Sequence, residues 1–277
     1  MGTTVHSYMP GLMSKVLGAG VDWDRIDVGD GSNIASVQSG VAAGMKSLVL
    51  YNPGLAGMAP STAASQVLAL AKQILPLGLH EIEFGNEVYY NGSTPQAYAA
   101  QYAAAHAAVA GLGITLIANA WGDYQTADGS WSQMSAGNGW IHDFIAADPG
   151  PVDAFSVHPY GPLGAITDGN DEGEDMIPAF HAMAVANGVN VPWYVTEVGQ
   201  NLGGNADFAG VSQTQQATDL TQYLNNMQTN YPYVTMLTWY EVVDDSSGQW
   251  GLVNSDASSR PSFTALAQWM STHTHNG

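Results

Sequence analysis

The sequence predicts one α/β domain over residues 1–277, folded as a single (β/α)8 TIM barrel with short loops. Short apolar, β-branched segments alternate eight times with longer Ala-rich segments, which is typical of a parallel sheet covered by helices. Each strand–helix unit takes roughly 35 residues, and eight such units suit a barrel of about 250 residues. A doubly wound open sheet would carry a Gly-rich phosphate turn after an early strand, and the sequence has none.

Each predicted element is justified by its composition and its boundaries. Strands are expected at 3–7, 23–28, 46–51, 80–84, 114–119, 152–158, 192–197 and 233–239. Helices are expected at 10–18, 33–43, 61–75, 95–111, 139–147, 175–187, 212–229 and 261–272. Thr94 before Pro95 is a helix-start signal, and Gly111 and Gly188 stand where predicted helices end. No linker, repeat or low-complexity tract divides the chain.

The charge balance excludes several classes of partner. The chain has 24 Asp and Glu but only 5 Lys and Arg, so its formal net charge is −19. The cations are Lys15, Arg25, Lys46, Lys72 and Arg260, and they form no basic patch. We therefore expect no binding to nucleic acid and none to an anionic membrane surface. Cys is absent, which excludes disulfides and thiolate metal sites.

Two glutamates stand at predicted strand ends on opposite sides of the barrel mouth. The fourth strand ends in "EFGNEV", which places Asn86 and Glu87, and the seventh ends in "VTEVGQ", which places Glu197. Functional side chains of such barrels lie at the carboxyl ends of strands, so these two carboxyls can converge. Paired carboxylates are what cleavage of a glycosidic bond requires. Position alone also allows two solvated loop carboxylates.

Four strings resemble the clan A glycoside hydrolases, which are retaining (β/α)8 enzymes, with families five and thirty-nine most similar. The strings are "EFGNE" at 83–87, "HPY" at 158–160, "TEVG" at 196–199 and the Trp at 239. The resemblance implies an acid/base at Glu87 and a nucleophile at Glu197. It further implies a sugar 2-hydroxyl contact from Asn86, a pair near the nucleophile at His158 and Tyr160, an aromatic sugar platform at Trp239, and a nearby arginine at Arg25.

The two carboxyls need different protonation states for this chemistry. Glu87 would start protonated, and Glu197 would stay ionised if Arg25 lies beside it. Arg25 sits in a predicted strand, so it needs a carboxylate partner, and an ion pair with Asp27 or Glu83 inside the barrel is the alternative. For Glu83 itself we expect a supporting hydrogen-bond role.

Further sugar contacts are expected from aromatic and polar residues near other strand ends, because sugar rings stack on aromatic faces. These candidates are His6, Tyr51, Asn119, Trp121 and Trp250. For His6, simple core packing is an equal alternative.

We predict a retaining glycoside hydrolase that cleaves β-glycosidic bonds in a neutral polysaccharide or oligosaccharide. Short loops favour endo action of a β-glucanase, mannanase or xylanase type, with an exo-acting β-glycosidase as the alternative. A non-catalytic carbohydrate-binding barrel and a metal-dependent barrel hydrolase are alternatives of other classes, although the latter would want a second His near His6. We expect no cofactor or metal, a carbohydrate as the partner, a monomer, and a secreted protein whose signal peptide is absent from this chain.

Overall fold

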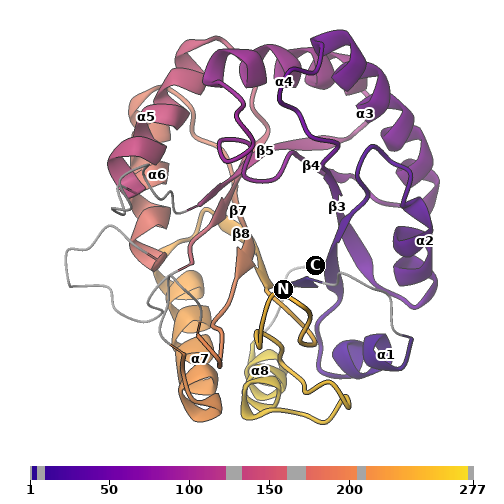
Figure 1. The fold of residues 1–277 in the computed structure, drawn as a ribbon, viewed down its shortest axis with the longest axis vertical. Coiled ribbons are helices and arrows are strands. Elements are labelled where there is room, and N and C mark those ends of the chain that lie inside the picture. The colour runs from indigo at the N-terminus through magenta and orange to yellow at the C-terminus, as the bar shows by residue number, and fades with distance from the viewer. Residues whose placement is uncertain (1, 5–9, 123–132, 161–172, 205–209, 274–277) are drawn as a thin grey trace.

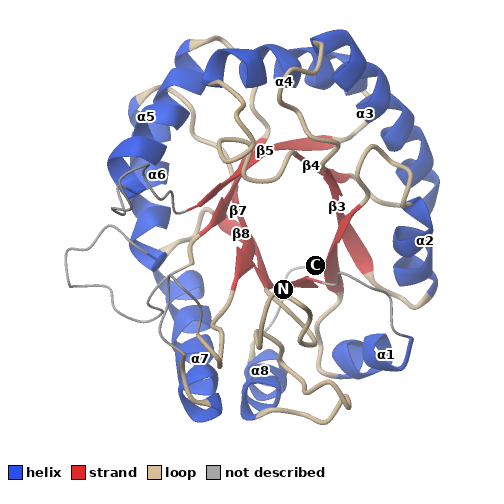
Figure 2. Cartoon of the chain, in the orientation of Figure 1, coloured by secondary structure: helices blue, strands red, loops and turns tan. Residues whose placement is uncertain are grey.

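The structure is a computed structural model. It describes residues 2–4, 10–122, 133–160, 173–204 and 210–273, and for 2–4, 10, 119–122 and 133–138 it describes the backbone alone. The described strands close into a parallel barrel in the order β1 to β8, and the helices surround it as an outer ring (Figures 1 and 2). Thr3 of β1 pairs with Trp239 of β8, which closes the ring.

The strands follow one another around the barrel in chain order. They are β1 Gly2–Thr4, β2 Trp23–Asp27, β3 Lys46–Tyr51, β4 Glu81–Phe84, β5 Thr115–Gly122, β6 Ala154–His158, β7 Trp193–Val198 and β8 Val234–Trp239. The helices are α1 Pro10–Gly18, α2 Ile34–Ala42, α3 Pro60–Ile74, α4 Pro95–Val109, α5 Gln133–Ala146, α6 Met176–Ala186, α7 Gln213–Asn230 and α8 Pro261–Thr272. Short 3-10 turns follow α3 at Leu75–Leu77 and precede α6 at Gly173–Asp175.

The predicted (β/α)8 barrel is confirmed, and most element boundaries agree with it closely. Helix α4 begins at Pro95, and Oγ1 of Thr94 accepts a 3.2 Å hydrogen bond from the backbone N–H of Ala97. The main differences lie around β5 and α5. Strand β5 runs on to Gly122 rather than ending at residue 119, and α5 begins at Gln133 rather than at residue 139.

Side chains of the barrel strands alternate between the interior and the surrounding helices. The lower interior holds a small apolar cluster of Leu48, Ile117, Ala154 and Met236, packed with Trp23 and Tyr194. One pleat further along the strands, the interior becomes polar, with Arg25, Glu83, Ser156, Thr196 and Thr238 all buried. The apolar residues between these positions, Ile82, Phe155, Val195 and Leu237, belong to the main core under the helices. The barrel therefore presents a buried polar layer directly beneath its carboxyl-end mouth.

No helix in the described ranges is both long enough and apolar enough to cross a membrane.

Candidate active site

Glu87 and Glu197 come together at one histidine ring. Nδ1 of His158, at the end of β6, lies 3.1 Å from Oε1 of Glu87 and 3.7 Å from Oε2 of Glu197. The His158 side chain is fully buried, whereas Glu87 and Glu197 are 29% and 13% exposed. Strands four and seven thus bring their terminal carboxyls to one point at the mouth, where a substrate can reach both.

Arg25 of β2 organises the Glu197 side of the site. Its Nη1 pairs with Oε1 of Glu197, and its Nη2 donates a 2.8 Å hydrogen bond to Oδ1 of Asn86. Its Nε donates to Oε2 of Glu83 at 2.5 Å. Burial alone would lower the Arg25 pKa, but the Glu83 and Glu197 carboxylates outweigh burial and raise the pKa above its ordinary value. Arg25 is therefore a permanent cation that pairs with both Glu83 and Glu197.

Asp27, the other partner considered for Arg25, bonds elsewhere. Its Oδ1 accepts from the backbone N–H of Gly29 at 2.7 Å, and its Oδ2 accepts from Nδ2 of Asn52 at 3.0 Å. Asp27 is exposed at the end of β2, so it stabilises the β2 turn rather than the buried guanidinium.

Glu197 is held in its ionised form. Burial acts to raise the Glu197 pKa, but His158 in its protonated form, the Arg25 charge and the hydrogen bonds from Tyr160 and Arg25 hold it below its usual range. The Tyr160 hydroxyl donates to Oε2 of Glu197 at 2.9 Å. Burial, and then the Glu197 and Glu87 charges, raise the pKa of Tyr160 well above its usual value, so this donor keeps its proton. An ionised carboxylate with two fixed donors suits a nucleophile.

Glu87 reaches the site from an unusual backbone position. Its φ is 43°, in the left-handed region that residues with a side chain rarely adopt. Two residues earlier, Gly85 has a φ of 87°, and a Cβ there would lie 2.5 Å from Cγ1 of Val88 and 2.9 Å from Cδ1 of Leu55. The "GNE" turn therefore requires Gly at 85, and it folds Glu87 back over the mouth toward His158.

Three aromatic rings lie together on the Glu197 side of the site. The ring of Tyr160 lies edge-on to Tyr240 at 6.3 Å and to Trp250 at 5.6 Å, and Tyr240 lies 5.8 Å from Trp250. Trp250 is buried, whereas Tyr160 and Tyr240 are half-buried. Tyr240 is the residue that the sequence interpretation missed. It follows Trp239 by one position, so the alternation of β8 turns it into the mouth of the barrel.

Two predicted sugar contacts face the wrong side of the barrel wall. Trp239 is fully buried in the core beneath the helices, so it cannot offer a ring face to a sugar. Tyr51 is also fully buried, stacks on Phe84 at 5.5 Å, and donates from its hydroxyl to Oε1 of Gln66 in α3 at 2.6 Å. The cause is the same in both strands, since each of these residues sits on the outward pleat of its strand.

Three other predicted contacts cannot be placed. His6 lies outside the described residues, and so do the side chains of Asn119 and Trp121, whose backbone belongs to β5. Within the described part of the chain, no three His, Asp or Glu residues are grouped so as to hold a metal ion.

Gly199 lets the ends of β7 and β8 approach each other. A Cβ at this position would overlap the carbonyl oxygen of Tyr240, and the backbone N–H of Tyr240 donates to the carbonyl oxygen of Val198 at 2.7 Å. The glycine of the "TEVG" string therefore brings Tyr240 beside the end of β7, close to Glu197.

No protein-family model and no curated protein sequence matches the chain. Several solved structures share its fold over nearly the whole length. A family 128 endo-β-1,3-glucanase from Amycolatopsis mediterranei, in complex with laminaripentaose, is 16% identical with a TM-score of 0.64, over 96% of this chain and 97% of that one. A family 17 β-1,3-glucanosyltransferase from Rhizomucor miehei is also 16% identical, with a TM-score of 0.64 over 95% and 96% of the two chains.

An endo-β-1,4-glucanase from Xanthomonas axonopodis pv. citri is 14% identical, with a TM-score of 0.62 over 98% of this chain and 94% of that one. At such identities the likeness concerns the fold. The chain therefore shares a closed (β/α)8 barrel with glycoside hydrolases, and it carries two converging carboxylates at the mouth of that barrel.

Proposed function

We propose that this protein is a retaining glycoside hydrolase that cleaves β-linked glucans, with Glu87 as acid/base and Glu197 as nucleophile. The observation that carries the proposal is the unequal environment of two carboxylates that share His158 Nδ1. Glu197 pairs with the Arg25 cation and accepts a hydrogen bond from Tyr160, whereas Glu87 faces the ring nitrogen of His158. Unequal environments assign different roles to two chemically similar groups.

In the first step, Glu87 gives its proton to the glycosidic oxygen while Oε2 or Oε1 of Glu197 attacks the anomeric carbon. The bond from that carbon to the glycosidic oxygen breaks, and the leaving sugar departs as an alcohol. In the second step, Glu87 takes a proton from water, the water oxygen attacks the anomeric carbon, and the ester to Glu197 breaks. Glu87 is again protonated at the end, and the configuration at the anomeric carbon is retained.

The substrate class follows from charge and from fold. Arg25, the cation at the described site, is already paired with two carboxylates, so it leaves no free positive charge for a uronate. A neutral glycan is therefore favoured. The structures that share the fold act on β-1,3- or β-1,4-glucans by their names, and this supports a β-glucan, with β-1,3-glucan as the first choice. Endo action remains part of the proposal.

The test is product analysis on laminari- and cello-oligosaccharides labelled at the reducing end, with NMR of the anomer formed first. We expect internal cleavage and the β-anomer first. Glu197→Gln is the matched control, and it should bind the oligosaccharides without turning them over. First formation of the α-anomer would refute retention, and release of terminal glucose alone would refute endo action. Unchanged turnover by Glu197→Gln would refute the nucleophile assignment.

Azide separates the two roles further. With Glu87→Ala and a substrate that has a good leaving group, azide should restore turnover and give a β-glycosyl azide. With Glu197→Ala it should give the α-azide, because azide then attacks from the face that the nucleophile has vacated.

A further inference from the structure

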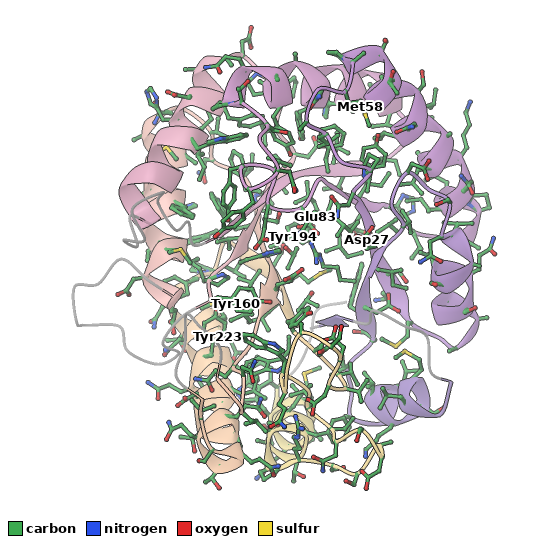
Figure 3. The ribbon with its side chains drawn as sticks, in the orientation of Figure 1. Asp27, Met58, Glu83, Tyr160, Tyr194 and Tyr223 are labelled. Atoms are coloured by element: carbon green, nitrogen blue, oxygen red, sulfur yellow. The ribbon has the colours of Figure 1, made fainter. Side chains whose placement is uncertain are left out.

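A third glutamate, Glu83, lies beneath the two carboxylates and touches neither. It is fully buried on β4, near the centre of the barrel (Figure 3). Both of its oxygens are bonded. Oε2 accepts from Nε of Arg25 at 2.5 Å, and Oε1 accepts from Oγ1 of Thr196 at 2.7 Å. A buried charge with two fixed donors is a rigid anchor, and each donor leads to a different catalytic group.

One arm runs through Arg25 to the nucleophile. The guanidinium is planar, so a bond at Nε fixes the plane in which both terminal nitrogens lie. Glu83 thereby holds Nη1 toward Glu197 and Nη2 toward Asn86. This arm keeps the positive charge of Arg25 beside Glu197, which favours the ionised form of that carboxylate.

The other arm runs through Thr196 and His158 to the acid/base. Glu83 is ionised against Arg25, so its oxygens accept only, and the Thr196 hydroxyl must donate its hydrogen to Oε1. The Thr196 oxygen is then left as an acceptor for Nε2 of His158, which lies 3.0 Å away. Nε2 must therefore carry a hydrogen, whatever the charge of the ring.

The hydrogen on Nε2 determines whether Nδ1 of His158 donates or accepts a hydrogen bond. In the neutral ring the hydrogen is on Nε2, so Nδ1 has a lone pair that faces Oε1 of Glu87 at 3.1 Å. A carboxylate oxygen against a lone pair is repelled unless a proton lies between the two atoms. While the ring stays neutral, that proton belongs to Glu87, which is then in the acid form that donates to a leaving group. The opposite tautomer, with the hydrogen on Nδ1, would instead donate to Glu87 and favour its ionised form.

We propose that Glu83 is a positioning residue that sets opposite protonation states on the two catalytic carboxylates, through Arg25 for Glu197 and through Thr196 and His158 for Glu87. The proposal rests on the proposed function, since it assigns those two roles. The charged groups that face the His158 ring from the neighbouring strands are Glu87 and Glu197, with Glu83 behind Thr196. The Tyr160 ring lies edge-on to it at 6.2 Å.

The first test uses Thr196→Val, with Thr196→Ser as its matched control. Valine keeps the shape and the β-branched side chain but removes both hydrogen bonds, whereas serine keeps both bonds. On an unactivated β-glucan, where the leaving oxygen needs a proton, we expect kcat to fall by about 100-fold, the low end of the effect of general acid catalysis. On an aryl β-glycoside whose phenolate leaves without protonation, we expect kcat/KM to change by less than about threefold. Thr196→Ser should keep both rates near wild type.

Glu83→Gln tests the anchor itself. The amide cannot accept from both donors in the same way, and it cannot hold the guanidinium by charge. Because the Arg25 arm serves the nucleophile, this variant should lose about tenfold or more on the aryl glycoside as well. A Glu83→Gln rate equal to wild type on both substrates would overturn the proposal. So would an equal loss on both substrates for Thr196→Val, because that pattern indicates a general distortion.

A readout independent of activity is the nitrogen NMR shift of the His158 ring, assigned by its loss in His158→Gln. Wild type and Thr196→Ser should carry the hydrogen on Nε2, and Thr196→Val should move it to Nδ1. The same tautomer in all three would refute the relay. If wild type cleaves no glycoside, the proposed function fails, while this measurement still decides whether Glu83 and Thr196 orient the ring.

Discussion

The hydroxyl of Tyr160 and the carboxylate of Glu197 are joined by a 2.9 Å hydrogen bond to Oε2, the oxygen that Arg25 does not hold. Removing it with Tyr160→Phe takes away one of the contacts that lower the Glu197 pKa. In the proposed mechanism, activity needs ionised Glu197 and is lost as pH falls through its pKa, so the acid limb of kcat/KM should move up by about one pH unit. At the optimum, kcat/KM should fall by about tenfold. The measurement is the pH profile of the rate.

Tyr240→Phe is the matched control for that change. The Tyr240 hydroxyl lies 3.2 Å from Oγ of Ser247, and its ring stands beside Tyr160. Losing this hydroxyl should leave the acid limb in place. A shift of the same size in both variants would contradict a specific role for the Tyr160 bond.

Substitutions of Tyr240 and Trp239 should have opposite effects on KM and on the free energy of unfolding. Tyr240 faces the mouth, so Tyr240→Ala should raise KM by about tenfold and leave the free energy of unfolding within about 1 kcal/mol of wild type. Trp239 is fully buried, so Trp239→Ala should destabilise the protein by about 3–5 kcal/mol. The milder Trp239→Phe should fold and keep its KM. A large rise in KM for Trp239→Phe would restore Trp239 as a sugar contact.

A third expectation concerns stability and pH. Asp24 on β2 is 1% exposed, and a Cβ on Gly40 of α2 would lie 2.8 Å from its Oδ2. Burial raises the Asp24 pKa to about 7 from an ordinary 3.8. Between these values the folded state keeps a proton that the unfolded state has lost. Stability should therefore decrease as pH rises from about 4 to about 7, by a few kcal/mol at most from this group.

Asp24→Asn removes that titration, so its unfolding free energy should depend less steeply on pH over this window, as urea titrations at several pH values would report. Burial also raises the Glu241 pKa to about 8, and this second group keeps part of the slope in every variant. Asp22→Asn is the control, because Asp22 lies near the start of the same strand but is 43% exposed. Equal slopes for wild type and Asp24→Asn would contradict the burial argument.

The left-handed backbone of Glu87 predicts that the stability of a variant depends on which residue replaces this glutamate. Asn tolerates a φ of 43° better than longer side chains do, because its short polar group bonds locally. Glu87→Asn should therefore be more stable than Glu87→Gln by about 0.5–1 kcal/mol, while neither supplies an acid. Thermal melts of the two variants measure this. A less stable Asn variant would show that the turn holds Glu87 without strain.

The sequence predicted the fold well because the barrel repeats one pattern that composition marks clearly. Each strand is a short β-branched run, and each helix is Ala-rich with caps such as Thr94. The convergence of Glu87 and Glu197 followed from strand order alone, since strands four and seven oppose each other in a closed ring of eight. Arg25 also lies where it was expected, with both Glu83 and Glu197 as partners.

The errors came from reading strand ends without reading the alternation along each strand. In β8, Thr238 faces inward, so Trp239 must face the helices and Tyr240 the mouth. The same alternation along β3 places the side chain of Tyr51 on the outward face of the strand. Alternation fails in β7, where the pairing with β8 shifts register between Val195 and Val198, and this irregularity lets neighbouring Thr196 and Glu197 both serve the interior. Sequence reasoning cannot foresee such a shift.

The buried hydrogen-bond network around Glu83 draws its residues from both halves of the chain. Arg25, Glu83 and Asn86 come from the first half of the barrel, whereas His158, Thr196 and Glu197 come from the second half. Two bonds of this network join the halves, from Thr196 to Glu83 and from Arg25 to Glu197. A fragment that ends after β4 would leave Arg25 and Glu83 on one face of an open sheet, without the Thr196 hydroxyl and the Glu197 carboxylate that pair with them. Two separate half-barrels should therefore be inactive alone and should recover the site only by assembling with each other.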